Sequence, residues 1–268
     1  MDSFSTDNTC ELAEKLGAKV YKNPWKNYAT QFNYGVYHCN IQSEWIWRID
    51  ADEFLEGELG TAVKEAVSKC SNQVNGVYVR KRIDFMNRSL LHGGWYPSYH
   101  LKVFRREHGD CENRWMDEHI RIFDGGTITV DDGNQVDANL NDLTWWTDKH
   151  NGYATREMVD MLMMQYGLDA KAQEVIPKFF GTEEQRKRWL KIKYIKSPLF
   201  VRPFINFVWR YILKGGFLDG KEGFIWHILQ GFWYRMLVDA KIYEIKKRFN
   251  YNEEAIKNYL KDNYLTKC

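Results

Sequence analysis

The first half of the chain alternates helix-like and strand-like patterns, and this alternation limits the fold more than any other feature of the sequence. Apolar residues recur at helical spacing in three segments, which short apolar runs separate. Ser5 is a candidate cap for the first helix, and Gly17 is a candidate stop. The predicted helices cover residues 5–17, 28–39 and 58–70, and the predicted strands cover 18–22, 45–49, 76–85 and 100–105. Such alternation predicts an α/β fold with a largely parallel sheet.

The second half of the chain has a different character. Residues 153–166 have the pattern of a Met-rich helix, and strand patterns fade from about residue 182. Residues 185–218 contain nine Lys or Arg and no Asp or Glu. We therefore expect two regions, residues 1–180 and 181–268, with a boundary near Phe180. The second region is predicted to be a helical appendage rich in basic and aromatic residues.

The cysteines and the apolar runs exclude several classes of protein. The five cysteines, at positions 10, 39, 70, 111 and 268, form no Cys-x-x-Cys pair, and their number is odd. A zinc site or a disulfide framework is therefore not expected, and a reducing compartment fits better. The first residues show no signal-segment pattern, and no run reaches the roughly 18 apolar residues of a membrane span. We expect a chain that does not cross a membrane.

An acidic sequence follows the compact apolar run at residues 45–49. Asp50 and Asp52 are two positions apart, directly after the predicted strand. The carboxyl ends of strands are where α/β proteins bind ligands. Two carboxylates at this place can hold Mg²⁺ or Mn²⁺, and the cation can in turn bind a diphosphate. The alternative is an ordinary solvated turn.

Several motifs follow one another along the chain. They are DSFSTDNT at 2–9, QFN at 31–33, RIDADE at 48–53, GWYP at 94–97, LKVFR at 101–105, WMDEH at 115–119 and GFLDG at 216–220. Together they resemble the motifs of glycosyltransferase family 2, whose members have the GT-A fold. The likeness runs from residue 2 to about residue 166 and continues more faintly at 216–220. The fourth and fifth motifs resemble the branch of bacterial lipopolysaccharide-core and capsule transferases.

The resemblance implies an inverting transfer of a sugar, expected to be a hexose, from a nucleotide-sugar to an acceptor hydroxyl. Asp117 and Glu118 are the candidate general bases, of which we favour Asp117. The residues expected to bind the nucleotide-sugar are Asp2, Gln31, Asn33, Asp50 and Arg156. The residues expected to hold the divalent metal are Asp50, Asp52 and His150.

In the family, a strand, a helix and another strand precede the first motif, whereas here Met1 stands immediately before Asp2. The GT-A domain is therefore expected to be incomplete at its N-terminus. Residues 1–268 alone are expected to bind a nucleotide poorly.

The basic and aromatic region after residue 185 suggests contact with an anionic membrane surface. Basic residues attract anionic headgroups, and Trp and Tyr settle at their level. We expect a cytoplasmic enzyme held at the inner face of the plasma membrane, where a glycan or lipid-linked acceptor would be presented. The alternative is a helical subdomain with a solvated basic face. No recognition motif accompanies the patch, and the net charge is only +2, so we expect no nucleic-acid partner.

The sequence leaves two alternatives to an enzyme of surface-glycan synthesis. One is a degenerate, non-catalytic, membrane-associated binding protein derived from such an enzyme. The other is a metal-dependent phosphohydrolase that uses Asp50 and Asp52. It is less favoured because the sequence lacks the further carboxylate or histidine clusters that it needs.

Overall fold

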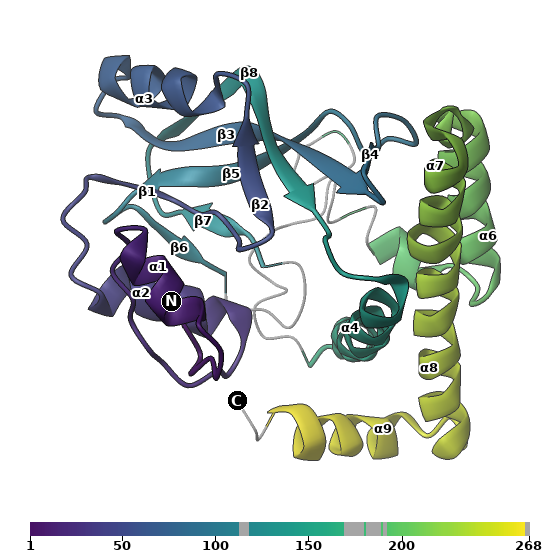
Figure 1. Cartoon of the computed structure of the whole chain (residues 1–268). Coiled ribbons are helices and arrows are strands. Elements are labelled where there is room, and N and C mark those ends of the chain that lie inside the picture. Colours follow the sequence, from purple (N-terminus) through teal and green to yellow (C-terminus); the bar gives the residue numbers. More distant parts are fainter. Residues whose placement is uncertain (113–117, 169–179, 181–188, 190–191, 266–268) are drawn as a thin grey trace. The chain divides into compact units, whose positions relative to one another are not determined.

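The computed structural model describes residues 1–268 except 113–117, 169–179, 181–188, 190–191 and 266–268 (Figure 1). The chain forms two compact units. The first contains Met1–Asp84 and Pro97–Ala138, and the second contains Phe85–Tyr96 and Asn139–Cys268. The units differ from the predicted division at residue 180 because α4 (Leu143–Gln165) packs against α8 (Tyr234–Arg248) of the second unit. The predicted division into a catalytic region at residues 1–180 and a membrane-proximal region at 181–268 stays a prediction.

The first unit is built on a mixed sheet. Five of its strands lie in the order β1-β5-β3-β8-β2 (Figure 1). Their bounds are Trp45–Trp47 (β1), Glu53–Glu56 (β2), Val74–Phe85 (β3), Ser98–Arg105 (β5) and Gly126–Ala138 (β8). Only the β3–β8 pair runs parallel among these described strands, and the other three pairings are antiparallel. The predicted α/β class is confirmed, while the expectation of a largely parallel sheet is corrected to a mixed one.

Helices and a small hairpin complete this unit. The helices are α1 (Thr9–Lys15), α2 (Tyr28–His38) and α3 (Leu59–Lys69), and the hairpin pairs β6 (Gly109–Cys111) with β7 (Ile120–Ile122). Helix α2 begins where predicted because the Asn27 side chain accepts a hydrogen bond from the Thr30 amide (2.7 Å). Helix α3 buries Leu59 and Val63 among valines of β3, β5 and β8, which form the main core.

Two local predictions near the N-terminus were wrong. Ser5 does not cap α1, which begins only at Thr9, and instead donates hydrogen bonds to the Asp2 carboxylate. The predicted strand at 18–22 is reduced to an isolated parallel bridge between Asp2 and Lys22. Gly17 follows the end of α1 as expected, with a φ of +88° that favours glycine.

The second unit is mainly helical. Its elements are β4 (Arg88–Ser89), α4, α6 (Val201–Phe207), η2 (Val208–Leu213), η3 (Gly216–Asp219), α7 (Gly220–Trp226), η4 (His227–Trp233), α8, α9 (Glu253–Leu260) and η5 (Lys261–Leu265). Helix α4 contains the predicted helix at 153–166 but begins ten residues earlier, at Leu143, because the Asp142 side chain caps the Trp145 amide (2.8 Å). Its buried face carries Met158, Met161 and Leu162. No described helix is long and apolar enough to cross a bilayer.

Candidate active site

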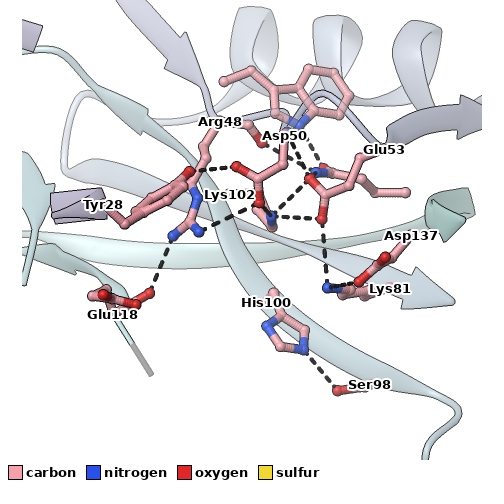
Figure 2. Close-up of polar contacts among 12 residues, drawn as sticks. Tyr28, Arg48, Asp50, Glu53, Lys81, Ser98, His100, Lys102, Glu118 and Asp137 are labelled. Carbon is pink, nitrogen blue, oxygen red and sulfur yellow. Dashed lines mark hydrogen bonds and ion pairs between the residues drawn. The ribbon is translucent and has the colours of Figure 1, made fainter. Parts of the chain in front are cut away.

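The acidic turn at residues 50–53 is positioned by the antiparallel pairing of β1 with β5. Strand β1 ends at Trp47, and the next residue, Arg48, continues along β5 through a 2.8 Å hydrogen bond from its amide to the Lys102 carbonyl oxygen. Asp50 therefore leaves the strand end beside Lys102 (Figure 2). The Glu53 amide then donates to the Asp50 carbonyl oxygen (3.0 Å), which closes the turn.

Hydrogen-bond donors and cations surround the Asp50 carboxylate. Tyr28, the first residue of α2, donates its hydroxyl to Oδ1. Arg48 Nη2 lies 3.5 Å from Oδ2, and Lys102 Nζ lies 3.6 Å from the same oxygen. The Arg48 guanidinium also lies over the Tyr28 ring, 4.3 Å from its centroid. The acid thus joins the start of α2 to the end of β1.

Glu53 forms the buried half of the same cluster. Lys102 Nζ lies 2.9 Å from each of its carboxylate oxygens, and Gln135 Nε2 donates to Oε2 at 2.6 Å. The Asp50 amide donates to Oε2 at 3.0 Å, and Lys81 Nζ lies 3.5 Å from Oε1. Figure 2 shows Glu53, Lys81 and Lys102 converging from β2, β3 and β5, and Gln135 belongs to β8. A buried charge with this many partners fixes the backbone of the turn.

The surrounding cations set the protonation state of both acids. Burial raises the pKa of Asp50, but Lys102 and then Arg48 outweigh it and hold the pKa below the ordinary value of 3.8. Burial also raises the pKa of Glu53, and Lys102 with the Asp50 amide brings it below the ordinary 4.5. Both groups are therefore ionised at neutral pH.

Asp52 differs from these two acids because it is exposed. Its carbonyl oxygen accepts a hydrogen bond from the Ala138 amide (3.0 Å), which ties the turn to the end of β8. An exposed carboxylate suits Mg²⁺ or Mn²⁺, whereas the Asp50 oxygens already face Tyr28, Arg48 and Lys102. Among the described residues, no three His, Cys, Asp or Glu side chains are grouped to hold a metal. Metal binding by Asp50, Asp52 and His150 therefore stays a prediction.

The side chains expected to contact the nucleotide near the N-terminus are engaged within the protein. The Asp2 carboxylate accepts from the Ser5 hydroxyl (2.5 Å) and amide (3.0 Å), and these bonds lower the pKa of Asp2 to about 2. Gln31 Nε2 donates to the Ser3 hydroxyl (3.0 Å), and Gln31 Oε1 accepts from Asn23 (2.8 Å).

Asn33 is engaged at both ends of its amide. Its Nδ2 donates to the Cys111 carbonyl oxygen and its Oδ1 accepts from the Cys111 amide, both at 2.8 Å. The amide thereby fastens α2 to β6. A nucleotide contact by Asp2, Gln31 or Asn33 stays a prediction.

Of the two candidate bases, only Glu118 is among the described residues. Asp117 lies outside the described residues. The carbonyl oxygen of Glu118 accepts a 3.2 Å hydrogen bond from Arg48 Nη1, so its backbone is attached to the cluster around Asp50 (Figure 2). Arg48 thus connects the strand-end acid with the segment predicted to supply the base.

His150 and Arg156 belong to the second unit, on α4. The His150 ring stacks on Trp146 with centroids 3.5 Å apart, and its Nδ1 is 2.8 Å from the Trp146 carbonyl oxygen. A proton must therefore sit on Nδ1. Burial lowers the pKa of His150, which favours this neutral form. A metal contact by His150 stays a prediction. Arg156 is exposed, with its guanidinium 5.6 Å from the Tyr153 ring centroid.

Sequence reasoning missed Lys102, Tyr28 and Gln135 as members of the cluster. Lys102 stands within an apolar strand, and a lysine in such a run signals a buried charge that needs an acidic partner. Strand β5 also carries Ser98 and His100, whose Oγ and Nε2 lie 3.0 Å apart (Figure 2). No local signal marks Tyr28 or Gln135, which reach the acids only through the tertiary fold.

Comparison with known proteins settles the family. The model of the family described as Glycosyl transferase family 2 matches residues 1–124. An uncharacterized glycosyltransferase of Rickettsia prowazekii is 41% identical over 273 residues, with 100% of this chain and 82% of the relative covered. The chain belongs to glycosyltransferase family 2. A further uncharacterized glycosyltransferase, from Rickettsia bellii, is 37% identical over 258 residues, with 93% of this chain and 78% of the relative covered.

Membership makes the chain a glycosyltransferase, and its mixed sheet and helices are consistent with the α/β GT-A fold. Such an enzyme uses a nucleotide-sugar donor and an acceptor. The motifs that carry the resemblance at residues 2–9, 31–33, 48–53 and 94–119 fall within the matched segment.

Proposed function

We propose that this glycosyltransferase is an inverting, metal-dependent enzyme that moves a hexosyl group onto a glycan or lipid-linked acceptor. The acceptor would belong to lipopolysaccharide, capsule or exopolysaccharide synthesis and would be presented at the inner face of the plasma membrane. The observation that carries the proposal is the strand-end turn, where Asp50 is held ionised by Lys102 and Arg48 while Asp52 is exposed.

The two aspartates have different roles in this proposal. Asp52, with its exposed carboxylate, would hold Mg²⁺ or Mn²⁺ together with the donor diphosphate. A metal contact by His150, which belongs to the other unit, stays a prediction from the sequence. The cation, when bound, offsets the charge that develops on the departing nucleoside diphosphate. Asp50 would orient the donor, because its own position is fixed by Tyr28, Arg48 and Lys102. Arg156 is the proposed contact for a phosphate.

The transfer itself exchanges one bond to the anomeric carbon for another. The acceptor hydroxyl oxygen would attack that carbon from the face opposite the diphosphate, and the bond to the diphosphate oxygen would break. Asp117, or Glu118 next to it, would take the hydroxyl proton. The Glu118 carbonyl contact to Arg48 supports this role, because it attaches the segment to the donor-orienting cluster.

A donor screen tests this proposal. Purified full chain is incubated with UDP-, GDP- and other nucleotide-hexoses in Mn²⁺, in Mg²⁺ and in EDTA, and release of nucleoside diphosphate is measured. A slow release of nucleoside diphosphate supports the proposal as long as the release requires the cation. We expect release with one donor class, lost in EDTA, and a product whose anomeric configuration is opposite to that of the donor. Release that EDTA leaves unchanged, or a product with retained configuration, would contradict the proposal.

A further inference from the structure

The helical segment at residues 201–213, formed by α6 and η2, has its polar side chains on the protected side. Arg202 is buried and binds Asp239 through Nε (2.8 Å) and Nη2 (2.5 Å). One turn later, Asn206 Nδ2 donates to the Gly231 carbonyl oxygen (2.7 Å). One turn further, Arg210 Nη1 donates to the Gly93 carbonyl oxygen (3.0 Å). The polar positions 202, 206 and 210 thus share one face that packs within the second unit.

The opposite face of the same segment is apolar and faces solvent. Its side chains are between 47% and 66% exposed. They are Val201, Phe204, Ile205, Val208, Trp209, Ile212 and Leu213, and we call them the α6–η2 face. Phe217, Leu218 and Phe224 add further exposed apolar side chains just after it. A water-facing helix normally shows the reverse pattern, so this arrangement suits an apolar medium.

The exposed charges next to the α6–η2 face in the sequence are mainly positive. Lys193 and Lys196 are exposed before the segment, and Lys214 and Lys221 are exposed after it. Between residues 192 and 221 the only acid is Asp219. It is buried and accepts hydrogen bonds from the backbone amides of Leu91 (3.2 Å) and His92 (2.9 Å). The exposed charged side chains of residues 192–221 are therefore all cations, and the half-buried Glu222 follows directly after them.

We propose that the α6–η2 face inserts in the plane of an anionic lipid bilayer, at the boundary between headgroups and acyl chains. Thirteen helical residues extend only about 20 Å, less than the roughly 30 Å of a bilayer core, so the segment would lie in the membrane surface. Trp209 would settle at the headgroup level, and the four lysines would meet anionic phosphates. The proposal names the surface that would contact the membrane. It rests on the proposed membrane location of the enzyme and does not depend on the transfer chemistry.

A second copy of the chain is the competing occupant. A twofold pairing places the same patch against itself, and it would bring the flanking lysines of both copies together. No exposed acid between residues 192 and 221 would offset this repulsion. An anionic bilayer supplies both the apolar medium and the opposite charge, so the charge pattern favours lipid.

Vesicle flotation of the full chain tests the proposal. The protein is mixed with phosphatidylcholine vesicles or with vesicles that also contain phosphatidylglycerol. The variant Ile205→Ser/Leu213→Ser removes apolar contacts, Lys214→Glu/Lys221→Glu reverses charge, and Leu140→Ser, at a position 86% exposed in the same unit, is the matched control. We expect binding to anionic vesicles that falls at least about tenfold in both double variants and is unchanged in the control.

A quenching experiment separates insertion from surface attachment. Brominated phosphatidylcholine is included in the anionic vesicles, and the quenched fraction of tryptophan fluorescence is compared for the wild type and Trp209→Phe. We expect part of the quenching to disappear in the variant. Circular dichroism and sedimentation confirm that each variant is folded and report self-association.

Three outcomes would overturn the inference. The first is that both double variants float with anionic vesicles as well as the wild type does. The second is that tryptophan quenching in Trp209→Phe equals that of the wild type. The third is that the wild type binds no vesicles but forms a dimer, which Ile205→Ser/Leu213→Ser dissociates. Metal-dependent donor turnover in the absence of lipid reports on the transfer chemistry separately. The two proposals can therefore fail independently.

Discussion

Lys102 Nζ lies 2.9 Å from both carboxylate oxygens of Glu53, with the two side chains only 6% and 1% exposed. The same ammonium lies 3.6 Å from Asp50 Oδ2. One buried cation thus serves two acids of the strand-end turn, and the Asp50 amide is bonded back to Glu53. The position of the Asp50–Asp52 turn therefore depends on a residue 50 positions away in the chain. The pair is a structural requirement for the site.

Replacing Lys102 by Met should destabilise the protein strongly. The change leaves Glu53 as a buried carboxylate without its main cation, which typically costs about 3–5 kcal/mol. Urea denaturation measures the loss. The matched control is Lys69→Met, because Lys69 pairs with Glu65 while 74% exposed and should contribute less than about 1 kcal/mol. Equal losses in the two variants would contradict a special role for the buried pair.

The same cluster predicts the direction of acid sensitivity. The pKa values of Asp50 and Glu53 are below their ordinary 3.8 and 4.5, so the folded protein binds these protons less readily than the unfolded chain. Their contribution to stability is complete above about pH 5. It is lost as the pH falls below 4.5 and then through the lower pKa values that the two acids have in the folded protein. Unfolding free energy should therefore fall more steeply with acid in the wild type than in Glu53→Gln. Parallel curves for the two proteins between pH 6 and 3 would argue against the assignment.

The main effect of Asn33→Ala should be a loss of folding stability and not a loss of nucleotide binding. The variant removes two 2.8 Å hydrogen bonds to the backbone of Cys111, a buried residue, and leaves that amide and carbonyl without their partner. The expected cost is about 1–3 kcal/mol. Asn72→Ala, at an exposed position, is the control and should be nearly neutral. An Asn33→Ala protein with unchanged stability but weakened donor binding would instead favour the direct nucleotide contact.

Gly216→Ala should destabilise the second unit through one contact. A Cβ at this position would lie 2.2 Å from Nε2 of His227, which is fully buried. Gly152→Ala is the control, since nothing lies within 4 Å of a Cβ there and an alanine favours the helix by about 0.5–1 kcal/mol. His227→Ala added to Gly216→Ala should cost less than the sum of the two single changes. Additive losses would show that the ring contact is not the cause.

Local sequence signals predicted the elements whose determinants are local. Helix α2 begins at its Asn27 cap, and α3 follows its spacing of apolar residues. Strand β8 was not anticipated, because Asp131, Asp132 and Gly133 interrupt its apolar pattern. The direction of strand pairing is a tertiary property, so the pattern could not distinguish the observed antiparallel neighbours of β5 from parallel ones.

The residues of the candidate site likewise divide into those that a local pattern predicts and those that only the tertiary fold brings together. Asp50 and Asp52 could be selected because an apolar strand leads directly into them. Apart from the neighbouring Arg48, the partners of Asp50 come from α2 and β5, at sequence distances that no local motif reports. The opposite environments of the two aspartates, one surrounded by cations and one exposed, follow from packing and were not visible in the sequence.

Asp52, in the turn between β1 and β2, is proposed to act with a divalent cation on the donor diphosphate. The measurement that tests this role is the rate of Mn²⁺-dependent nucleoside diphosphate release by Asp52→Asn, compared with Asp132→Asn, an exposed acid elsewhere in the same unit. We predict a fall of at least about 100-fold for Asp52→Asn, since electrostatic stabilisation of the departing charge is lost, and wild-type rates for Asp132→Asn. Equal rates for the two variants, with the same Mn²⁺ dependence, would show that Asp52 does not act through the cation.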